Sequence, residues 1–106
     1  MRLKDKVVIV TGGAKGIGRA YCLGMAAEGA RVVVADVADP KSTVQEVEAR
    51  GAQALGVECD VSREEDTLRL ATETLARFGR VDVLVNNAAL YGPLKRRPRI
   101  TPGTFS

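Results

Sequence analysis

The chain has no histidine among its 106 residues, and it has only two cysteines. Without imidazole groups, histidine-based acid–base catalysis and histidine-ligated metal sites are excluded. Cys22 and Cys59 lack the spacing of a metal-binding pair, so we expect two buried free thiols. Any chemistry at this protein must therefore rest on other groups.

Long apolar segments are missing as well. Residues 1–6 are mostly charged, and the apolar run after them is too short for a signal peptide or a membrane span. There are no internal repeats and no low-complexity segments. We therefore expect a soluble, cytoplasmic protein with no membrane partner.

The formal net charge of +3 comes from one short segment. Residues 95–99 supply four positive charges and no acidic group, whereas residues 1–94 contain 12 basic and 13 acidic groups. A nucleic-acid-binding protein spreads its basic residues over a folded face. We therefore predict no nucleic-acid binding, and we predict that residues 95–106 form a basic, proline-containing, irregular tail.

The most informative stretch runs from residue 7 to residue 18 and reads VVIVTGGAKGIG. Its four β-branched residues in a row predict a strand that is buried on both faces. Gly12, Gly16 and Gly18 then allow a sharp turn, a close approach to a pyrophosphate, and packing of the next helix on the sheet. The N-terminus of that helix favours an anion by about 0.3–1 kcal/mol. This pattern predicts a nucleotide site.

Apolar strands and amphipathic helices alternate along the rest of the chain. We predict strands over residues 31–36, 53–58 and 81–86, and helices over 17–28, 39–50 and 62–78, the second capped by Asp39 and the third opened by a capping box of Ser62 and Glu65. The first helix is expected to bury Ile17, Ala20, Leu23, Gly24 and Ala27, and the third Leu68, Ala71, Leu75 and Phe78. Gly24 is expected to let the first helix approach the sheet closely.

This alternation predicts an α/β fold. Right-handed crossovers between successive strands give a Rossmann-type, doubly wound parallel sheet with strand order 3-2-1-4 that ends after the fourth strand. Only one helix would cover the second face of this sheet, and the fourth strand would be a bare edge. We therefore expect self-association.

Two acidic residues follow strands on the edge where such sheets bind ligands. Asp36 ends the second strand, where a carboxylate can accept hydrogen bonds from a ribose diol; the alternative is a helix cap. Asp60 follows the third strand and suits either an exocyclic adenine amine or a cap of the next turn. Both alternatives for Asp60 remain open from the residues alone.

Three motifs together closely resemble the short-chain dehydrogenase/reductase family. They are Thr11-Gly12-x-x-x-Gly16-x-Gly18, Asp60-Val61 and Asn86-Asn87-Ala88-Ala89, in that order along the chain. The resemblance covers residues 1–94 and implies a dinucleotide-binding Rossmann half-domain there. It also implies an NAD(P)-dependent oxidoreductase that acts on a small alcohol or carbonyl substrate. Ala89 departs from the glycine that is usual in the family.

The resemblance also implies a set of cofactor-binding residues. The glycine-rich loop would cradle the pyrophosphate, Asp36 would bind the adenosine ribose, and the two motifs after the third and fourth strands would border adenine and the nicotinamide-side ribose. The set is Thr11, Gly12, Gly13, Ala14, Lys15, Gly16, Ile17, Gly18, Asp36, Asp60, Val61, Asn87 and Ala88. NAD is the expected cofactor rather than NADP, because Asp36 would face the 2′-phosphate and Val37 offers no cation. Lys15 would offset this in part.

The family's catalytic Ser and Tyr-x-x-x-Lys pair are not visible in this sequence. Tyr91 and Lys95 match the pair by spacing, but Gly92 and Pro93 between them disfavour the helix that the chemistry needs. We therefore predict no catalytic residue and no turnover by the chain as given.

Two other functions are alternatives to a nicotinamide-dependent oxidoreductase. One is a noncatalytic dinucleotide-binding module. The other is a class I methyltransferase that binds S-adenosylmethionine, although such proteins usually have an acidic residue where Thr11 stands. A phosphate-binding loop of the NTPase type is excluded, because Lys15-Gly16 is not followed by Ser or Thr.

Overall fold

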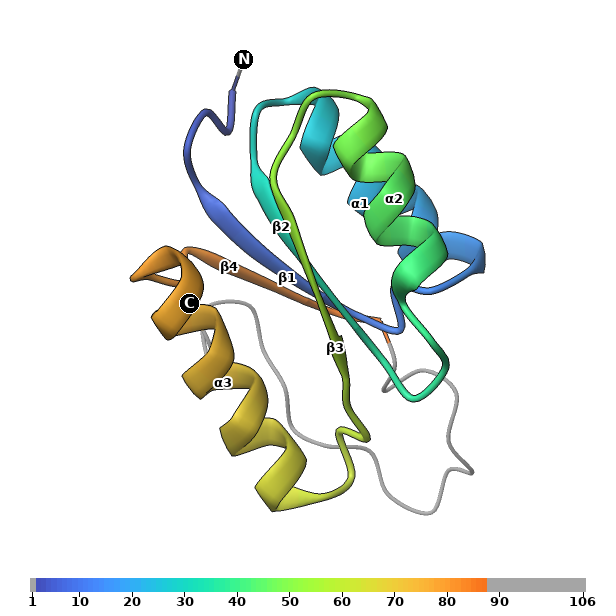
Figure 1. Ribbon diagram of the computed structural model, residues 1–106, viewed down its shortest axis with the longest axis vertical. Helices are drawn as coiled ribbons and strands as arrows, with labels where there is room; N and C mark the ends of the chain where they lie inside the picture. The colour runs from blue at the N-terminus through green and yellow to red at the C-terminus, as the bar shows by residue number, and fades with distance from the viewer. Residues whose placement is uncertain (1, 88–106) are drawn as a thin grey trace.

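A computed structural model describes residues 2–87, and within this range four parallel strands alternate with three helices (Figure 1). The strands are β1 (Val7–Thr11), β2 (Arg31–Asp36), β3 (Ala54–Glu58) and β4 (Val83–Asn86). The helices are α1 (Gly16–Ala27), α2 (Lys41–Ala49) and α3 (Glu64–Phe78). The strand order is β3-β2-β1-β4. The predicted α/β fold and sheet order are confirmed.

The two central strands are buried on both faces, as their runs of β-branched residues predict. Val8, Val10, Val32 and Val34 pack in one apolar cluster with Cys22 and Ala26 of α1 and Val47 of α2. Val7, Ile9, Val33 and Ala35 pack in a second cluster with Leu70 of α3. Figure 1 shows α1 and α2 together, with α3 standing apart from them. The sheet therefore forms the middle layer of three.

Only one helix, α3, covers the second face of the sheet, as predicted, yet the centre of that face is buried. Val7 and Val33 are 0 % exposed there, and Ile9 is 5 % exposed. Short aliphatic side chains need little cover, and Leu70 and Phe78 of α3 contribute to it. The exposed apolar groups lie instead at the margins, where all four residues of β4 are half-buried.

The inward face predicted for α1 is wrong except at Leu23, which is half-buried and packs against the first apolar cluster. Ile17 is 59 % exposed, and a Cβ added at Gly24 would meet nothing within 4 Å, so Gly24 makes no close approach. The buried residues are Gly18, Cys22 and Ala26. Helix α1 has small or apolar side chains on more than one of its sides, so the periodicity of the sequence allows more than one inward face. The contact between the start of the helix and the turn after β1 selects the face.

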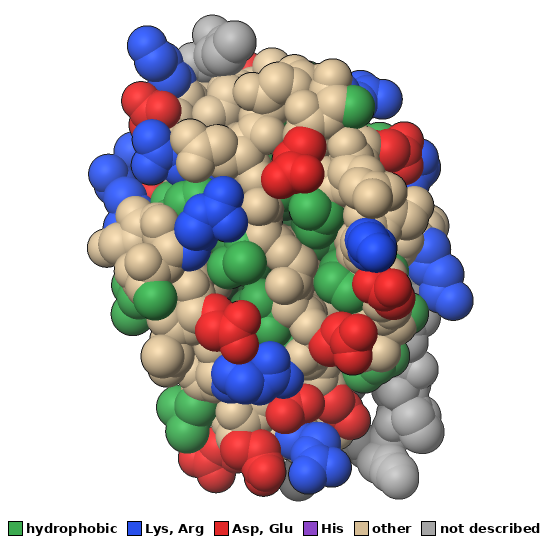
Figure 2. Space-filling view, viewed as in Figure 1, with side chains coloured by type: hydrophobic (Ala, Val, Ile, Leu, Met, Phe, Trp, Pro, Cys, Tyr) green, Lys and Arg blue, Asp and Glu red, His purple; other side chains and the backbone are tan. Residues whose placement is uncertain are grey.

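The prediction for α3 is wrong in the same way. Leu68 is 62 % exposed and Leu75 51 % exposed, whereas Leu70 and Thr74 are buried. Phe78 is half-buried, as expected of an inward residue. One flank of α3 thus carries large apolar side chains at the surface. On the face in Figure 2, hydrophobic side chains lie among acidic and basic ones.

The capping box predicted for α3 is also wrong. The N-cap is Arg63, without a side-chain cap, and the Oγ of Ser62 donates to Oδ1 of Asp60 at 2.6 Å. Because α3 starts at Glu64, Ser62 stands one position before the N-cap rather than at it. Three acidic residues in the first turn complement the dipole of α3 instead.

Helix α2 starts one residue later than predicted, with Pro40 rather than Asp39 as its N-cap. Asp39 still serves the helix start, because its Oδ1 accepts from the N–H of Lys41 at 2.9 Å. Strand β4 starts at Val83 rather than at residue 81. Asp82, just before β4, contacts β1 through both groups: its Oδ2 accepts from the N–H of Val7 at 2.8 Å, and its N–H donates to the carbonyl of Val7 at 2.9 Å.

Asp82 predicts a pH-dependent contribution to stability. Hydrogen bonds from Arg80 and from the N–H of Val7 hold the pKa of this carboxyl below its ordinary value. A lowered folded-state pKa stabilises the fold at neutral pH, and this stabilisation is lost as the pH falls from about 4 through the folded-state pKa. We expect Asp82→Asn to lower the free energy of unfolding by about 1 kcal/mol at pH 7. The difference from wild type should shrink as the pH falls below about 4.

Urea unfolding of both proteins from pH 7 to pH 3 measures this effect. Asp5→Asn is the control, because Asp5 is 65 % exposed, makes only a 3.5 Å contact with Arg31, and has a φ of 63° that asparagine tolerates. A pH-independent difference between Asp82→Asn and wild type would contradict the prediction.

Candidate functional site

The predicted site residues that the structure describes follow the carboxyl ends of the strands. Thr11 ends β1, Asp36 ends β2, and Asn87 follows β4 directly. Strand β1 lies between β2 and β4. The next strands, β2 and β3, lie on one side of β1, and β4 lies on the other, so the direction of strand addition reverses at β1. This is the switch point at which open parallel sheets bind ligands. Ala88, Tyr91, Lys95 and the tail 95–106 lie outside the described residues.

The structure explains why glycine is needed at three positions of the glycine-rich motif. Gly12 and Gly16 have φ values of 69° and 62°, in the left-handed region that favours glycine. A Cβ at Gly18 would lie 1.9 Å from the carbonyl oxygen of Gly12, so this residue permits contact between α1 and the turn. A Cβ at Gly16 would meet nothing within 4 Å. The loop is tight on its inner side and open around Gly16.

The N-terminus of α1 has no side-chain cap, and its first turn contains no acidic residue. Its N-cap is Lys15. The first turn of α3, by contrast, contains Glu64, Glu65 and Asp66. The N–H groups at the start of an α-helix have no partner within the helix. The first turn of α1, which follows Lys15 as its N-cap, therefore suits an anion such as a phosphate.

Asp36 lies against the loop. Its Oδ2 accepts from the N–H of Ala14 at 2.9 Å, and its Oδ1 accepts from the N–H of Ala38 at 3.0 Å. Asp36 therefore caps a local turn but not helix α2, which starts at Lys41. An ionised carboxylate offers about four acceptor positions, so two bonds leave room for a ligand hydroxyl.

Asparagine and threonine side chains connect β1 to β4 at the switch point. The Oγ1 of Thr11 lies 3.0 Å from Oδ1 of Asn86, and Nδ2 of Asn87 donates to the carbonyl of Gly12 at 3.2 Å. Asn87 is 2 % exposed, and its Oδ1 is buried without a hydrogen-bond partner in the described part of the chain. An unsatisfied buried oxygen is costly, and a ligand that donates to it would remove the cost.

The residues after β3 are engaged locally. Oδ1 of Asp60 accepts from the N–H and the Oγ of Ser62, and these bonds lower the pKa of Asp60. The N–H of Asp60 donates to Oδ2 of Asp66, and Val61 is 37 % exposed. The turn-capping alternative for Asp60 is thus realised, and the adenine contact of Asp60 and Val61 stays a prediction.

Thr43 is a polar contact of the loop that sequence reasoning missed. It lies in the first turn of α2, is fully buried, and donates its Oγ1 hydrogen to the carbonyl of Ala14 at 3.2 Å. A threonine in an amphipathic helix resembles many surface residues. Its only signal in the sequence is its place four residues before Val47, which also faces inward.

The two cysteines are buried and free, as predicted. Burial raises the pKa of Cys22 to about 12 and raises that of Cys59 as well, so both stay protonated at neutral pH. Among residues 2–87, no group of three or more histidine, cysteine, aspartate or glutamate side chains is arranged to bind a metal ion. No helix within that range is long and apolar enough to cross a membrane.

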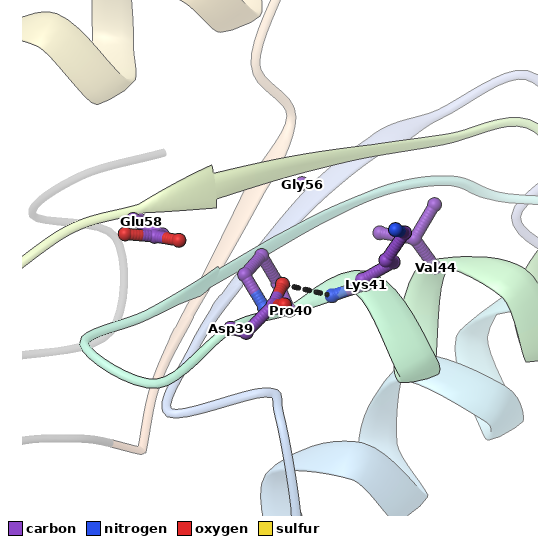
Figure 3. A pocket seen from close by; sticks show the side chains of 6 residues that line it. All are labelled: Asp39, Pro40, Lys41, Val44, Gly56 and Glu58. Atoms are coloured by element: carbon purple, nitrogen blue, oxygen red, sulfur yellow. Dashed lines mark hydrogen bonds between the residues drawn. The ribbon is translucent and has the colours of Figure 1, made fainter.

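An open hollow of about 430 Å³ lies between the start of α2 and the edge strand β3 (Figure 3). Its lining residues are Asp39, Pro40, Lys41, Val44, Gly56 and Glu58. None of them belongs to the predicted cofactor set. Gly56 allows α2 to lie close to β3, because a Cβ there would be 3.0 Å from Pro40 and from Val44.

Residues 6–103 match the family model described as short chain dehydrogenase. The chain is 44 % identical over 104 residues to L-fucose dehydrogenase of Oryctolagus cuniculus, covering 98 % of this chain and 36 % of that protein. The chain spans little more than a third of the length of such relatives.

Two solved structures have the same arrangement of strands and helices. A hydroxysteroid dehydrogenase from Escherichia coli superposes with a TM-score of 0.78 at 37 % identity, covering 80 % of this chain and 37 % of that one. A short chain dehydrogenase from Mycobacterium paratuberculosis bound to NAD superposes with a TM-score of 0.79 at 29 % identity, covering 84 % of this chain and 38 % of that one. With its parallel sheet and glycine-rich turn, the chain belongs to the short-chain dehydrogenase family of oxidoreductases.

Proposed function

We propose that this chain is the NAD-binding portion of an oxidoreductase that interconverts an alcohol and a carbonyl compound. One observation carries the proposal: the Asp36 carboxylate lies against a glycine-rich loop, and the helix after this loop has no acidic residue in its first turn. The unsatisfied Oδ1 of Asn87 and the open space at Gly16 fit a ligand there as well. NAD would supply hydride acceptance and donation at its nicotinamide ring.

The residues of this chain would bind and orient the dinucleotide. The first-turn N–H groups of α1 would donate to the pyrophosphate, with the charge of Lys15 nearby. The carboxylate of Asp36 would accept from the ribose hydroxyls, and the Oδ1 of Asn87 would accept from a hydroxyl on the nicotinamide side. Asp60 and Val61 would border adenine, and Ala88 would lie beside Asn87 in the chain.

Calorimetric titration of the chain with NAD, NADP and S-adenosylmethionine tests the proposal. We expect binding of NAD, weaker binding of NADP, and none of S-adenosylmethionine. Binding of S-adenosylmethionine alone would favour a methyltransferase-like protein instead. Absence of binding by all three would overturn the proposal.

We do not assign the catalytic step to the residues of this chain. The described residues contain no Tyr-x-x-x-Lys pair that could supply a proton to the substrate. A noncatalytic dinucleotide-binding module therefore remains the second candidate, and we expect no turnover by these 106 residues. Steady oxidation of any alcohol in a panel, lost in Tyr91→Phe, would contradict this. A cytoplasmic location and the absence of a nucleic-acid or membrane partner stay predictions.

We also propose that the chain self-associates. The flank of α3 with Leu68 and Leu75 and the edge strand β4 leave apolar groups at the surface. Exposed apolar patches and unpaired edges favour association. Light scattering should give a mass above 11.3 kDa that falls upon dilution.

A paired substitution provides the control for this measurement. Leu68→Glu with Leu75→Glu should shift the population to monomer, because both side chains are already exposed in the single chain. Glu64→Gln with Glu73→Gln is the control, because it alters charge on α3 without removing an apolar group. A mass of one chain for wild type at every concentration would contradict the prediction.

A further inference from the structure

Both backbone polar groups of Ala14 are held by side chains from other elements. Oδ2 of Asp36, at the end of β2, accepts from its N–H at 2.9 Å. Oγ1 of Thr43, in the first turn of α2, donates to its carbonyl oxygen at 3.2 Å. The preceding residue is fixed too, because the N–H of Gly13 donates to the carbonyl of Ala35 at 3.2 Å. The loop is therefore pinned at its middle.

The loop needs such contacts because its own residues do not restrict it. Ala14 lies between Gly12 and Gly16, which both adopt positive φ values. Glycine loses more conformational freedom on folding than any other residue, so a glycine-rich segment samples many conformations unless it is held. Contacts that hold the loop in one conformation therefore keep the first turn of α1 in one position relative to it.

Helix α2 holds the Thr43 hydroxyl in a fixed position. Val47, one turn further along α2, is fully buried in the core, and Gly56 of β3 allows Pro40 and Val44 to pack closely on the strand. Arg19 of α1 also pairs with Glu46 of α2. Thr43 therefore contacts the loop from a helix that is anchored to both the sheet and α1.

We propose that Thr43 is a positioning residue for the glycine-rich loop. Its hydroxyl holds the Ala14 carbonyl and thereby keeps the loop in the conformation that binds the dinucleotide. The inference rests on the proposed function, since the ligand it serves is NAD. Thr43 itself is fully buried and would act through Ala14.

Substitution by valine isolates the hydroxyl. Thr43→Val keeps the shape of the side chain and removes the donor, so the loop gains other conformations. Apparent affinity falls in proportion to the binding-competent fraction, and we expect NAD to bind about tenfold more weakly. Thr43→Ser keeps the donor and should bind NAD within about twofold of wild type.

Thr74 offers a matched control in α3. It is also fully buried, and its Oγ1 donates to the carbonyl of Leu70 at 2.8 Å. Thr74→Val therefore removes a buried threonine hydroxyl of the same kind, but away from the loop. It should lower stability as Thr43→Val does and leave NAD affinity unchanged.

The experiment combines calorimetric titration of the chain with NAD and amide hydrogen exchange measured by NMR. In Thr43→Val we expect weaker NAD binding and faster exchange within residues 12–18, both restored in Thr43→Ser and both absent in Thr74→Val. If Thr43→Val does not fold, Thr43→Ala and Thr43→Ser are compared, because both lose bulk and only serine keeps the donor.

The outcomes separate this inference from the proposed function. Wild-type binding with unchanged affinity in Thr43→Val would overturn the role of Thr43. Equal weakening in Thr43→Val and Thr74→Val would also overturn it, because the effect would then be general destabilisation. Absence of NAD binding by wild type would overturn the proposed function. Loop exchange in the ligand-free variants would then still decide whether Thr43 positions the loop.

Discussion

Replacing Gly18 by alanine is expected to abolish NAD binding and to lower the free energy of unfolding by about 3 kcal/mol. The added Cβ would lie 1.9 Å from the carbonyl oxygen of Gly12 and 2.8 Å from Nδ2 of Asn87. The Gly12 atom belongs to the backbone of the turn after β1, so it cannot move aside as a flexible side chain would. Helix α1 would have to shift, and its N-terminus would leave the loop.

Gly24 gives the control in the same helix. A Cβ there would meet nothing within 4 Å, and the residue is exposed. Gly24→Ala should therefore raise the free energy of unfolding by about 1 kcal/mol through helix propensity alone, and it should leave NAD affinity unchanged. Urea unfolding and calorimetric titration measure both quantities. Similar effects of Gly18→Ala and Gly24→Ala would contradict the packing argument.

The second large effect concerns the choice between NAD and NADP. Asp36→Asn removes a negative charge from the place where we expect the adenosine ribose. Two like charges about 4 Å apart cost up to about 4 kcal/mol at an effective dielectric near 20, and less where water screens them. We expect the ratio of the NADP to the NAD dissociation constant to fall about tenfold to a hundredfold. Asparagine retains an oxygen that can accept from Ala14.

Asp39→Asn is the matched control for this titration. Asp39 lies three residues further on and accepts from the N–H of Lys41 at the start of α2. Its loss of charge should leave the cofactor ratio within about twofold, because it is not among the predicted ribose contacts. An unchanged ratio in Asp36→Asn, or an equal change in both variants, would contradict the proposed place of the ribose.

Local sequence patterns predicted the layout of the fold. Four consecutive β-branched residues before Gly12 predicted the buried strand β1, because only a strand covered on both faces suits such a run. Alternation of strands and helices, with right-handed crossovers, then fixed the strand order. The roles of the glycines in the loop could also be predicted, because a left-handed backbone and a close contact both require glycine.

Which face of each helix lies inward was decided only by tertiary structure. In α1 the contact of Gly18 with the turn brings Cys22 inward and leaves Ile17 exposed. In α3 Leu70 is buried while Leu68 is exposed, because both flanks of the helix carry apolar residues and periodicity cannot distinguish them.

The candidate site divides along the same line. The sequence by itself determined that a glycine-rich turn, an acidic strand end and an asparagine pair meet at one edge of a parallel sheet. Each of these motifs stands at the end of a predicted strand, and the ends of parallel strands lie at the same edge. Tertiary structure alone decided that Asp36 and Thr43 hold the two sides of Ala14. Those contacts join segments far apart in the sequence, and a single hydroxyl or carboxylate leaves no periodic pattern that would predict its partner.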